Sequence, residues 1–237
     1  MTHLFKEIPR KISEVKGLIC FSLWGTSEFY WHGACRNAID ASIFYPKWTV
    51  RFYVDDSTDE RSLERLRDLG AEVQVMNTLP APFGGLFWRF LGATSSDHDV
   101  FVCRDVDCRF SVREVSAVAE WLESGSNFHI MRDHPYHTVP ILGGLWGSRT
   151  QFMRAIGFQT HLNAWGVRDK KGVDQDFLAS LYPSLRADSL EHSAFIAFPK
   201  SNTRRFPTRR ISNEFVGEVF DQNDMPVLKD RLLIPIR

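Results

Sequence analysis

One stretch of the sequence indicates the fold: Asp99-Val100-Phe101-Val102-Cys103-Arg104-Asp105-Val106-Asp107. Its first part is an apolar run too short for a helix, which is typical of a buried β-strand. It then becomes charged, and the nearby Ser111-Val112-Arg113-Glu114 has the spacing of a capping box at a helix start. The sequence therefore predicts a strand, a loop over residues 104–110 and a helix through Leu122.

Similar units occur on both sides of this stretch. Apolar or β-rich runs predict strands at 18–24, 48–54, 71–76, 128–131 and 194–198, and apolar spacing predicts helices at 58–69, 149–156 and 173–181. Strands that alternate with helices indicate an α/β fold with a mostly parallel central sheet and helices on both faces. Ligands of such sheets bind beyond the carboxyl ends of the strands, where Asp55-Asp56 and Asp105-Val106-Asp107 are expected.

The length of 237 residues suits one domain with an appendage. We expect an N-terminal segment at 1–16, a domain at 17–199, and an irregular, basic, proline-interrupted arm at 200–237 packed on that domain. Residues 1–16 lack the apolar core of a signal peptide, and no run reaches the roughly 20 apolar residues of a membrane helix. The four cysteines form no Cys-x-x-Cys pair, which favours reduced thiols and a cytoplasmic location with at most peripheral membrane contact.

The composition is that of a globular protein with an aromatic core. Hydrophobic residues make up 43% of the chain and aromatic residues 13%, which argues against disorder. The 29 basic and 29 acidic residues cancel, so a generic nucleic-acid-binding protein is not indicated. The sequence carries no signal for an oligomeric state.

Asp105 and Asp107 are the main candidates for chemistry. Two carboxylates separated by one residue in a loop can hold Mg²⁺ or Mn²⁺ and leave room for phosphate oxygens. A solvated turn is the alternative, but the position directly after a buried strand favours a site.

These motifs resemble those of nucleotide-sugar-dependent glycosyltransferases of the GT-A fold, in which a DxD motif follows an apolar strand. Val54-Asp55-Asp56-Ser57-Thr58-Asp59 is similar to the family-2 strand followed by Asp-Asp-Gly-Ser-Thr-Asp, without the glycine, and Gly172-Val173-Asp174-Gln175-Asp176-Phe177-Leu178 resembles the Asp-Gln-Asp segment of glycogenin-like family-8 enzymes. The resemblance covers about residues 17–199. It implies a single GT-A-like domain, with the exact family left open.

The resemblance also implies a Mn²⁺ or Mg²⁺ site and a nucleoside diphosphate sugar as donor, with a UDP-sugar the first candidate. The metal ligands would be Asp105, Asp107 and a histidine from the carboxyl-terminal part. His192 is our candidate for that histidine, and His134 and His137 are the alternatives.

We expect the donor to be bound by residues at strand ends, in a glycine segment and in basic segments: Trp24, Asp55, Asp56, Arg89, Asp105, Gly143, Gly144, Arg204 and Arg205. Glycine permits a close approach of the sugar to the backbone. The segment 200–210 has five basic residues and no acid, which suits phosphate oxygens, anionic lipid or polysaccharide.

The expected reaction moves a sugar to a hydroxyl of a glycan, polysaccharide or glycolipid, as in polysaccharide biosynthesis. Negative charge that develops on the leaving diphosphate would be neutralised by the metal. Asp174 and Asp176 are the catalytic candidates, as a general base if the configuration inverts and as sugar-orienting groups if it is retained. Alternatively, Asp174 and Asp176 have no catalytic role and only stabilise the start of a helix through its macrodipole.

Two other functions remain open. A sugar nucleotidyltransferase shares an α/β nucleotide fold, but its usual glycine-rich basic loop after the first strand is replaced here by Ser22-Leu23-Trp24-Gly25-Thr26-Ser27. A non-catalytic carbohydrate-binding protein would explain the aromatic residues, but such proteins are normally all-β rather than alternating.

Overall fold

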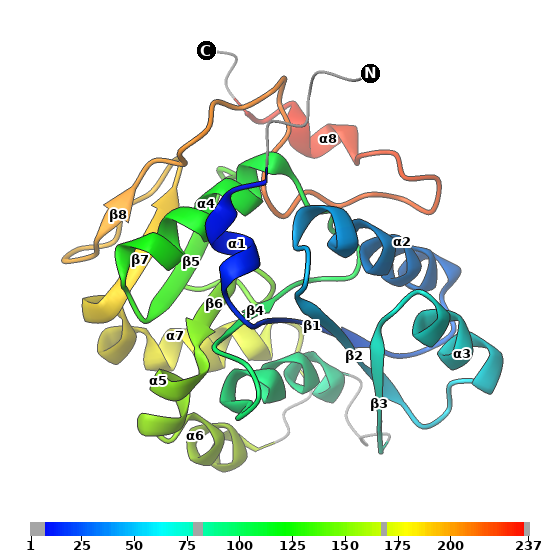
Figure 1. The fold of residues 1–237 in the computed structure, drawn as a ribbon. Helices are drawn as coiled ribbons and strands as arrows, with labels where there is room; N and C mark the ends of the chain where they lie inside the picture. Colours follow the sequence, from blue (N-terminus) through cyan, green and yellow to red (C-terminus); the bar gives the residue numbers. More distant parts are fainter. Residues whose placement is uncertain (1–7, 78–82, 167–169, 235–237) are drawn as a thin grey trace.

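The computed structural model describes residues 8–77, 83–166 and 170–234. Within them, one eight-stranded sheet has the order β3-β2-β1-β4-β6-β5-β7-β8 (Figure 1). The strands are β1 (Gly17–Leu23), β2 (Thr49–Asp55), β3 (Glu72–Met76), β4 (Val100–Cys103), β5 (Phe128–Arg132), β6 (Trp146–Arg149), β7 (Ser189–Ser193) and β8 (Thr203–Arg204). Among these strands, β6 runs antiparallel to both neighbours and the other pairs are parallel, which confirms the predicted mostly parallel sheet.

Helices cover both faces of the sheet, as expected (Figure 1). The described helices are α1 (Arg10–Glu14), α2 (Glu28–Phe44), α3 (Glu60–Asp68), the 3₁₀ helix η1 (Gly84–Thr94), α4 (Val112–Ser124), α5 (Thr150–Ala155), α6 (Phe158–Trp165), α7 (Val173–Leu185), the 3₁₀ helix η2 (Arg186–Asp188) and α8 (Leu228–Arg231). Strand β1 shows how alternation builds the two cores. Ile19 and Phe21 pack with α2, α3 and α4, whereas Leu18 and Cys20 pack with η1, α6 and α7.

The carboxyl ends of β1 and β4 lie side by side at the centre of the sheet. The two strands pair in parallel from Gly17 with Val100 to Cys20 with Cys103. The loop after Cys103 therefore lies beside the end of β1. The predicted strand, loop and helix around this point are confirmed by β4, residues 104–111 and α4.

The strand predicted at residues 194–198 is wrong. The strand is β7, which ends at Ser193, and residues 194–198 form bends and irregular backbone. Strand β7 has the sequence Ser-Leu-Glu-His-Ser, so it shows no apolar run, yet all five residues are buried. Buried polar side chains are stable when they find partners, and Glu191 of this strand accepts hydrogen bonds from Arg132 and from Tyr182.

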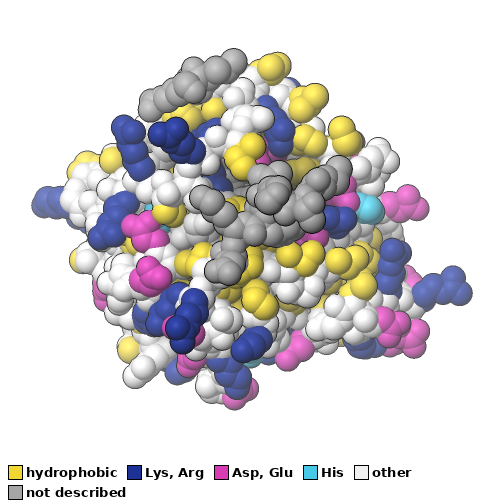
Figure 2. All heavy atoms as spheres, turned by 45° about the horizontal axis from the view of Figure 1, so that its top comes forward, with side chains coloured by type: hydrophobic (Ala, Val, Ile, Leu, Met, Phe, Trp, Pro, Cys, Tyr) yellow, Lys and Arg dark blue, Asp and Glu magenta, His cyan; other side chains and the backbone are white. Residues whose placement is uncertain are grey.

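The segment after residue 200 packs on the rest of the molecule. Its Phe206 and Val216 join a small apolar cluster with Ala117, Met131 and Leu145. The same segment exposes large apolar side chains: Ile211, Met225, Leu228, Leu232 and Leu233. Figure 2 shows hydrophobic, basic and acidic side chains intermixed on the face that includes the top of Figure 1. None of the described helices is long and apolar enough to cross a bilayer.

A buried carboxylate anchors this segment. Asp133, at the end of β5, is fully buried and accepts hydrogen bonds from Arg113 of α4, from Arg210 and from the backbone N–H of Val216. Arg113 also donates to the carbonyl of Thr208. The division at residue 200 remains a prediction about domain organisation.

Candidate active site

A pocket of about 650 Å³ opens at the carboxyl ends of β1 and β4. Its walls come from the end of β1, the loop after β4, helix η1, the segment before β6, the start of α7 and the segment after residue 216. The lining residues are Ser22, Leu23, Trp24, Tyr30, Phe83, Leu86, Arg89, Asp105, Val106, Asp107, Cys108, His137, Leu142, Gly143, Leu145, Lys171, Gly172, Asp174, Gln175, Gly217 and Val219. Segments far apart in the sequence therefore build one cavity at the edge expected for an α/β sheet.

Arg104 anchors the loop that carries Asp105 and Asp107. The buried guanidinium of Arg104 donates to Glu114 Oε1 at 2.7 Å and to the Cys103 carbonyl at 2.6 Å. Asp105 and Asp107 both line the pocket. Burial, and then the negative charge of Asp105, raise the pKa of Asp107 to about 6. The folded protein therefore disfavours the charged form of Asp107.

Arg89 joins two acidic residues at the floor of the pocket. Its buried guanidinium donates through Nη1 to Asp105 and through Nη2 to Asp174 Oδ2 at 2.8 Å. A side chain at Gly143 would overlap Asp174 and Arg89, and one at Gly144 would overlap Asp105. The two glycines therefore leave room for this cluster. Burial raises the pKa of Asp174, although the charge of Arg89 opposes the shift.

The structure brings one part of the predicted site together. The predicted residues that line the pocket are Trp24, Arg89, Asp105, Asp107, Gly143 and Asp174, and Gly144 lies against Asp105. The predicted residues that the structure places outside this lining are Asp55, Asp56, Asp176, His192, Arg204 and Arg205. Asp176 is half exposed at the start of α7 and binds Lys170 Nζ at 2.7 Å.

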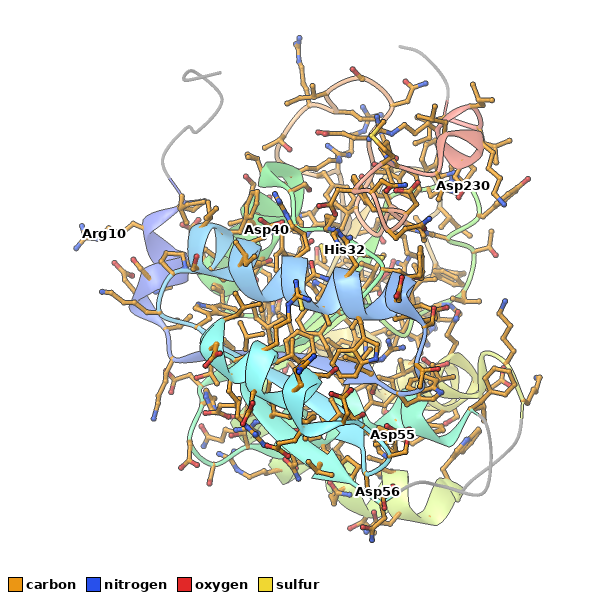
Figure 3. All side chains as sticks on the ribbon, turned by 90° about the vertical axis from the view of Figure 1, so that its right-hand side faces the viewer. Arg10, His32, Asp40, Asp55, Asp56 and Asp230 are labelled. Atoms are coloured by element: carbon orange, nitrogen blue, oxygen red, sulfur yellow. The ribbon has the colours of Figure 1, made fainter. Side chains whose placement is uncertain are left out.

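Asp55 stabilises the turn that ends β2. Its carboxylate accepts hydrogen bonds from Ser57 Oγ at 3.0 Å, Thr58 Oγ1 at 2.8 Å and the Gly25 N–H at 3.4 Å. Asp56 is exposed beside it, and Figure 3 shows both residues at this strand end. The predicted donor-binding pair is therefore placed at a neighbouring strand end rather than in the pocket wall.

His192 is not brought together with Asp105 and Asp107. It is fully buried in β7, where its Nδ1 lies 2.8 Å from His129 Nε2 and its Nε2 lies 3.3 Å from Glu120 Oε2 of α4. Burial lowers its pKa. Arg204 binds the same carboxylate at 3.0 Å, and Arg205 is exposed. The side chain of His192 is directed toward α4 because alternate residues of a strand point to opposite faces of the sheet.

Of the two alternative histidines, His137 reaches the pocket. Its Nδ1 accepts a hydrogen bond from the Asp133 backbone N–H at 3.0 Å, which places the ring proton on Nε2. Burial and the neighbouring His134 lower the pKa of His137 to about 3, so the ring is neutral at physiological pH. His134 instead contacts the Asp230 carbonyl at 2.9 Å. Across the described ranges, no three His, Cys, Asp or Glu side chains form a ready metal-binding cluster.

Several pocket residues were not predicted from the sequence. Tyr30 comes from α2, a helix that the pattern did not reveal, and burial with the charges of Asp107 and Asp105 raises its pKa. Gly217 and Val219 come from the segment after residue 200, from which Arg204 and Arg205 were expected at the donor instead. Lys171 and Gln175 also line the pocket, and their only sequence signal was their position beside the predicted Asp174.

Solved structures with a similar fold are known, although no family model and no curated protein matches the chain. Glucosyl-3-phosphoglycerate synthase from Mycobacterium tuberculosis, in complex with Mn²⁺, UDP-glucose and phosphoglyceric acid, superposes with a TM-score of 0.51 and 15% identity over 81% of this chain and 76% of that chain. Its complex with Mn²⁺, UDP and glucosyl-3-phosphoglycerate gives a TM-score of 0.51 and 14% identity over the same shares. The chain has a GT-A-like fold. The fold that the strand before Asp105 led us to expect is thereby confirmed.

Proposed function

We propose that this protein is a metal-dependent glycosyltransferase that moves a sugar from a nucleoside diphosphate sugar, a UDP-sugar first, to a hydroxyl acceptor. The observation that carries the proposal is the pair Asp105 and Asp107. Both residues follow β4 and line a pocket of about 650 Å³. This volume is within the usual range of small-molecule sites. Structures of similar fold that contain Mn²⁺ with UDP or UDP-glucose support the choice of donor and metal.

Asp105 and Asp107 would hold the divalent ion. Their oxygen atoms suit Mg²⁺ or Mn²⁺. Burial, and then the charge of Asp105, raise the pKa of Asp107 to about 6, and a bound cation would offset this penalty on the charged form. Two protein carboxylates suffice for such an ion, because water and phosphate oxygens complete its shell. When bound, the ion would act as a Lewis acid that stabilises the charge on the diphosphate leaving group.

The chain's own residues would orient the reactants. Asp174 is buried and fixed by Arg89, whereas Asp176 is exposed and bound to Lys170, so Asp174 is our candidate for the carboxylate beside the transferred sugar. It would accept the acceptor's proton if the configuration inverts, and would orient the sugar if it is retained. His137 would donate from Nε2 to an oxygen of the donor.

Trp24 and Tyr30 offer aromatic surface for the donor. Both line the pocket, and the Trp24 ring is fixed edge-to-face on Trp88 with centroids 6.2 Å apart. Rigid aromatic rings bind flat ligand groups at a small entropic cost. We propose a glycan, polysaccharide or glycolipid as the acceptor, and a cytoplasmic location with at most peripheral membrane contact.

Titration calorimetry with UDP, GDP, CDP and dTDP, with and without Mn²⁺, tests the proposal. We expect Mn²⁺-dependent binding of one diphosphate, lost in Asp107→Asn, which removes the charge but keeps the shape. Asp68→Asn makes the same change on the exposed end of α3 and should bind like the wild type. Absence of nucleotide binding by folded wild-type protein would overturn the proposal and favour a carbohydrate-binding protein.

A further inference from the structure

The loop that carries Asp105 and Asp107 is covered by the segment 217–227, which we call the arm hairpin. Cys108 forms an isolated antiparallel bridge with Val219, and the Phe220 N–H donates to the Asp107 carbonyl at 2.9 Å. The arm hairpin closes on itself through a second bridge, Phe220 with Pro226. The backbone of the candidate metal loop is therefore held by residues more than a hundred positions later.

Arg109 links the loop to the arm hairpin. Its side chain is 8% exposed, and its Nη1 donates to the carbonyls of Val106 at 3.2 Å and Cys108 at 2.9 Å. Its Nε and Nη2 donate to Asp224 Oδ1 at 3.0 and 2.8 Å. One guanidinium thus connects two loop carbonyls to one carboxylate, and its fixed fork of donors makes this geometry specific.

Helix α2 meets the same carboxylate. Asp224 Oδ2 lies 3.4 Å from His32 Nε2 and 3.8 Å from Arg36 Nη1. Figure 3 shows His32 on α2. Asn37 of the same helix donates from Nδ2 to both loop carbonyls that Arg109 contacts, at 3.0 Å each. The loop, helix α2 and the arm hairpin therefore converge on Asp224.

The position of Asp224 is set by its own turn. Asp221 Oδ1 accepts the N–H groups of Asn223 at 2.8 Å and Met225 at 2.9 Å. Asp224 has φ +57°, a left-handed conformation that is uncommon outside glycine and that surrounding contacts must maintain. The turn is thus a specific structure that presents this carboxylate to Arg109.

We propose that Asp224 is a positioning residue for the candidate metal site: it fixes Arg109, and through Arg109 the loop backbone that presents Asp105 and Asp107. This inference rests on the proposed function. If Asp224 lost its carboxylate, the nearly buried guanidinium of Arg109 would have no counter-charge. This arrangement is costly, so it favours movement of the loop. Loss of a hydrogen-bond partner of a metal-ligating side chain typically weakens metal binding about 10- to 100-fold, and we expect the lower end of this range for Asp224, which acts through Arg109.

The variant Asp224→Asn tests the proposal, because it keeps the size of the side chain. We expect Mn²⁺ affinity in the presence of UDP to fall by about tenfold, while UDP binding in EDTA stays at the wild-type value. We also expect faster amide hydrogen exchange over residues 104–110 in the ligand-free protein. Arg109→Gln should give the same changes, and the double variant no more than either single variant.

Asp68→Asn is the matched control. Asp224→Glu keeps the charge and should retain most of the Mn²⁺ affinity, and it can be measured even if Asp224→Asn does not fold. Wild-type Mn²⁺ affinity and wild-type exchange over residues 104–110 in Asp224→Asn would overturn the positioning role. If the wild type itself binds no nucleotide with Mn²⁺, the proposed function fails, and the exchange measurement alone still decides whether Asp224 orders the loop.

Discussion

Asp107 is a side chain whose charged form the folded protein disfavours. Burial and Asp105 raise its pKa to about 6, above the value near 4 of an unfolded chain. Ionisation therefore costs stability above pH 6, and this cost is lost as the pH falls from 6 toward 4. We expect metal-free Asp107→Asn to be about 1–3 kcal/mol more stable than the wild type at pH 8.

Urea denaturation in EDTA at pH 8 and pH 4 measures this effect, with Asp68→Asn as the control. The stability difference between wild type and Asp107→Asn should shrink at pH 4. A variant less stable than the wild type at pH 8 would show that the Asp107 carboxylate forms stabilising contacts instead.

Arg89 is the counter-charge for two acidic residues, so its replacement has a predictable cost. Arg89→Lys retains the charge but lacks the fork that reaches Asp105 and Asp174 together. A single ammonium would leave one of the two carboxylates without its counter-charge, so we expect a loss of about 2–4 kcal/mol of unfolding free energy. Thermal denaturation measures it against Arg61→Lys, an exposed residue of α3. Equal losses in the two variants would contradict the bridging role.

Among the elements, α4 combines a helix start with the support of the site. Ser111 Oγ accepts the Glu114 N–H at 3.2 Å, as the capping pattern predicts. The Glu114 carboxylate instead accepts from Arg104 and Tyr45, which anchors the loop before the helix. We expect Ser111→Ala to cost about 1 kcal/mol in urea denaturation. Ser116→Ala, within the same helix, should be neutral or slightly stabilising, and a similar loss there would contradict the cap.

Elements with a strong local signal were predictable, and others were not. Strand β4 and helix α4 have an apolar run and a capping serine. Helix α2 buries small residues such as Gly33, Ala34 and Ala38, so it shows no stripe of large apolar side chains. Strand β7 is polar and buried, because its partners come from elsewhere in the fold. The local sequence pattern indicates where apolar side chains are buried, but it does not indicate where polar side chains are buried with hydrogen-bond partners.

At the scale of the whole molecule, ligand binding should stabilise the fold. A ligand that binds only the native state adds about 2.7 kcal/mol at 100 times its Kd. For a chain of this size, that corresponds to a rise in Tm of about 5–10 °C. We expect this rise with UDP and Mn²⁺ together and not in Asp107→Asn, measured by differential scanning fluorimetry. The same rise in the variant would place the binding site elsewhere.

The sequence predicted the acidic pair because its signal is local. The Arg89–Asp174 ion pair joins residues 85 positions apart, and the Arg109–Asp224 pair joins residues 115 positions apart. No pattern within either segment indicates such partners, because the topology of the sheet brings them together. The same reason explains His192, whose position before an apolar run suggested a ligand while the fold directs it to His129 and Glu120.

The Arg109–Asp224 pair also sets an order of events during synthesis. A ribosome adds about 5–20 residues per second, so Asp224 emerges several seconds or more after the loop that it contacts. Just before that point, strands β1 to β8 have been synthesised, but the loop at residues 104–110 still lacks its contact with Asp224. We therefore expect a growing chain to gain its GT-A-like core before the candidate metal-binding loop is fully ordered.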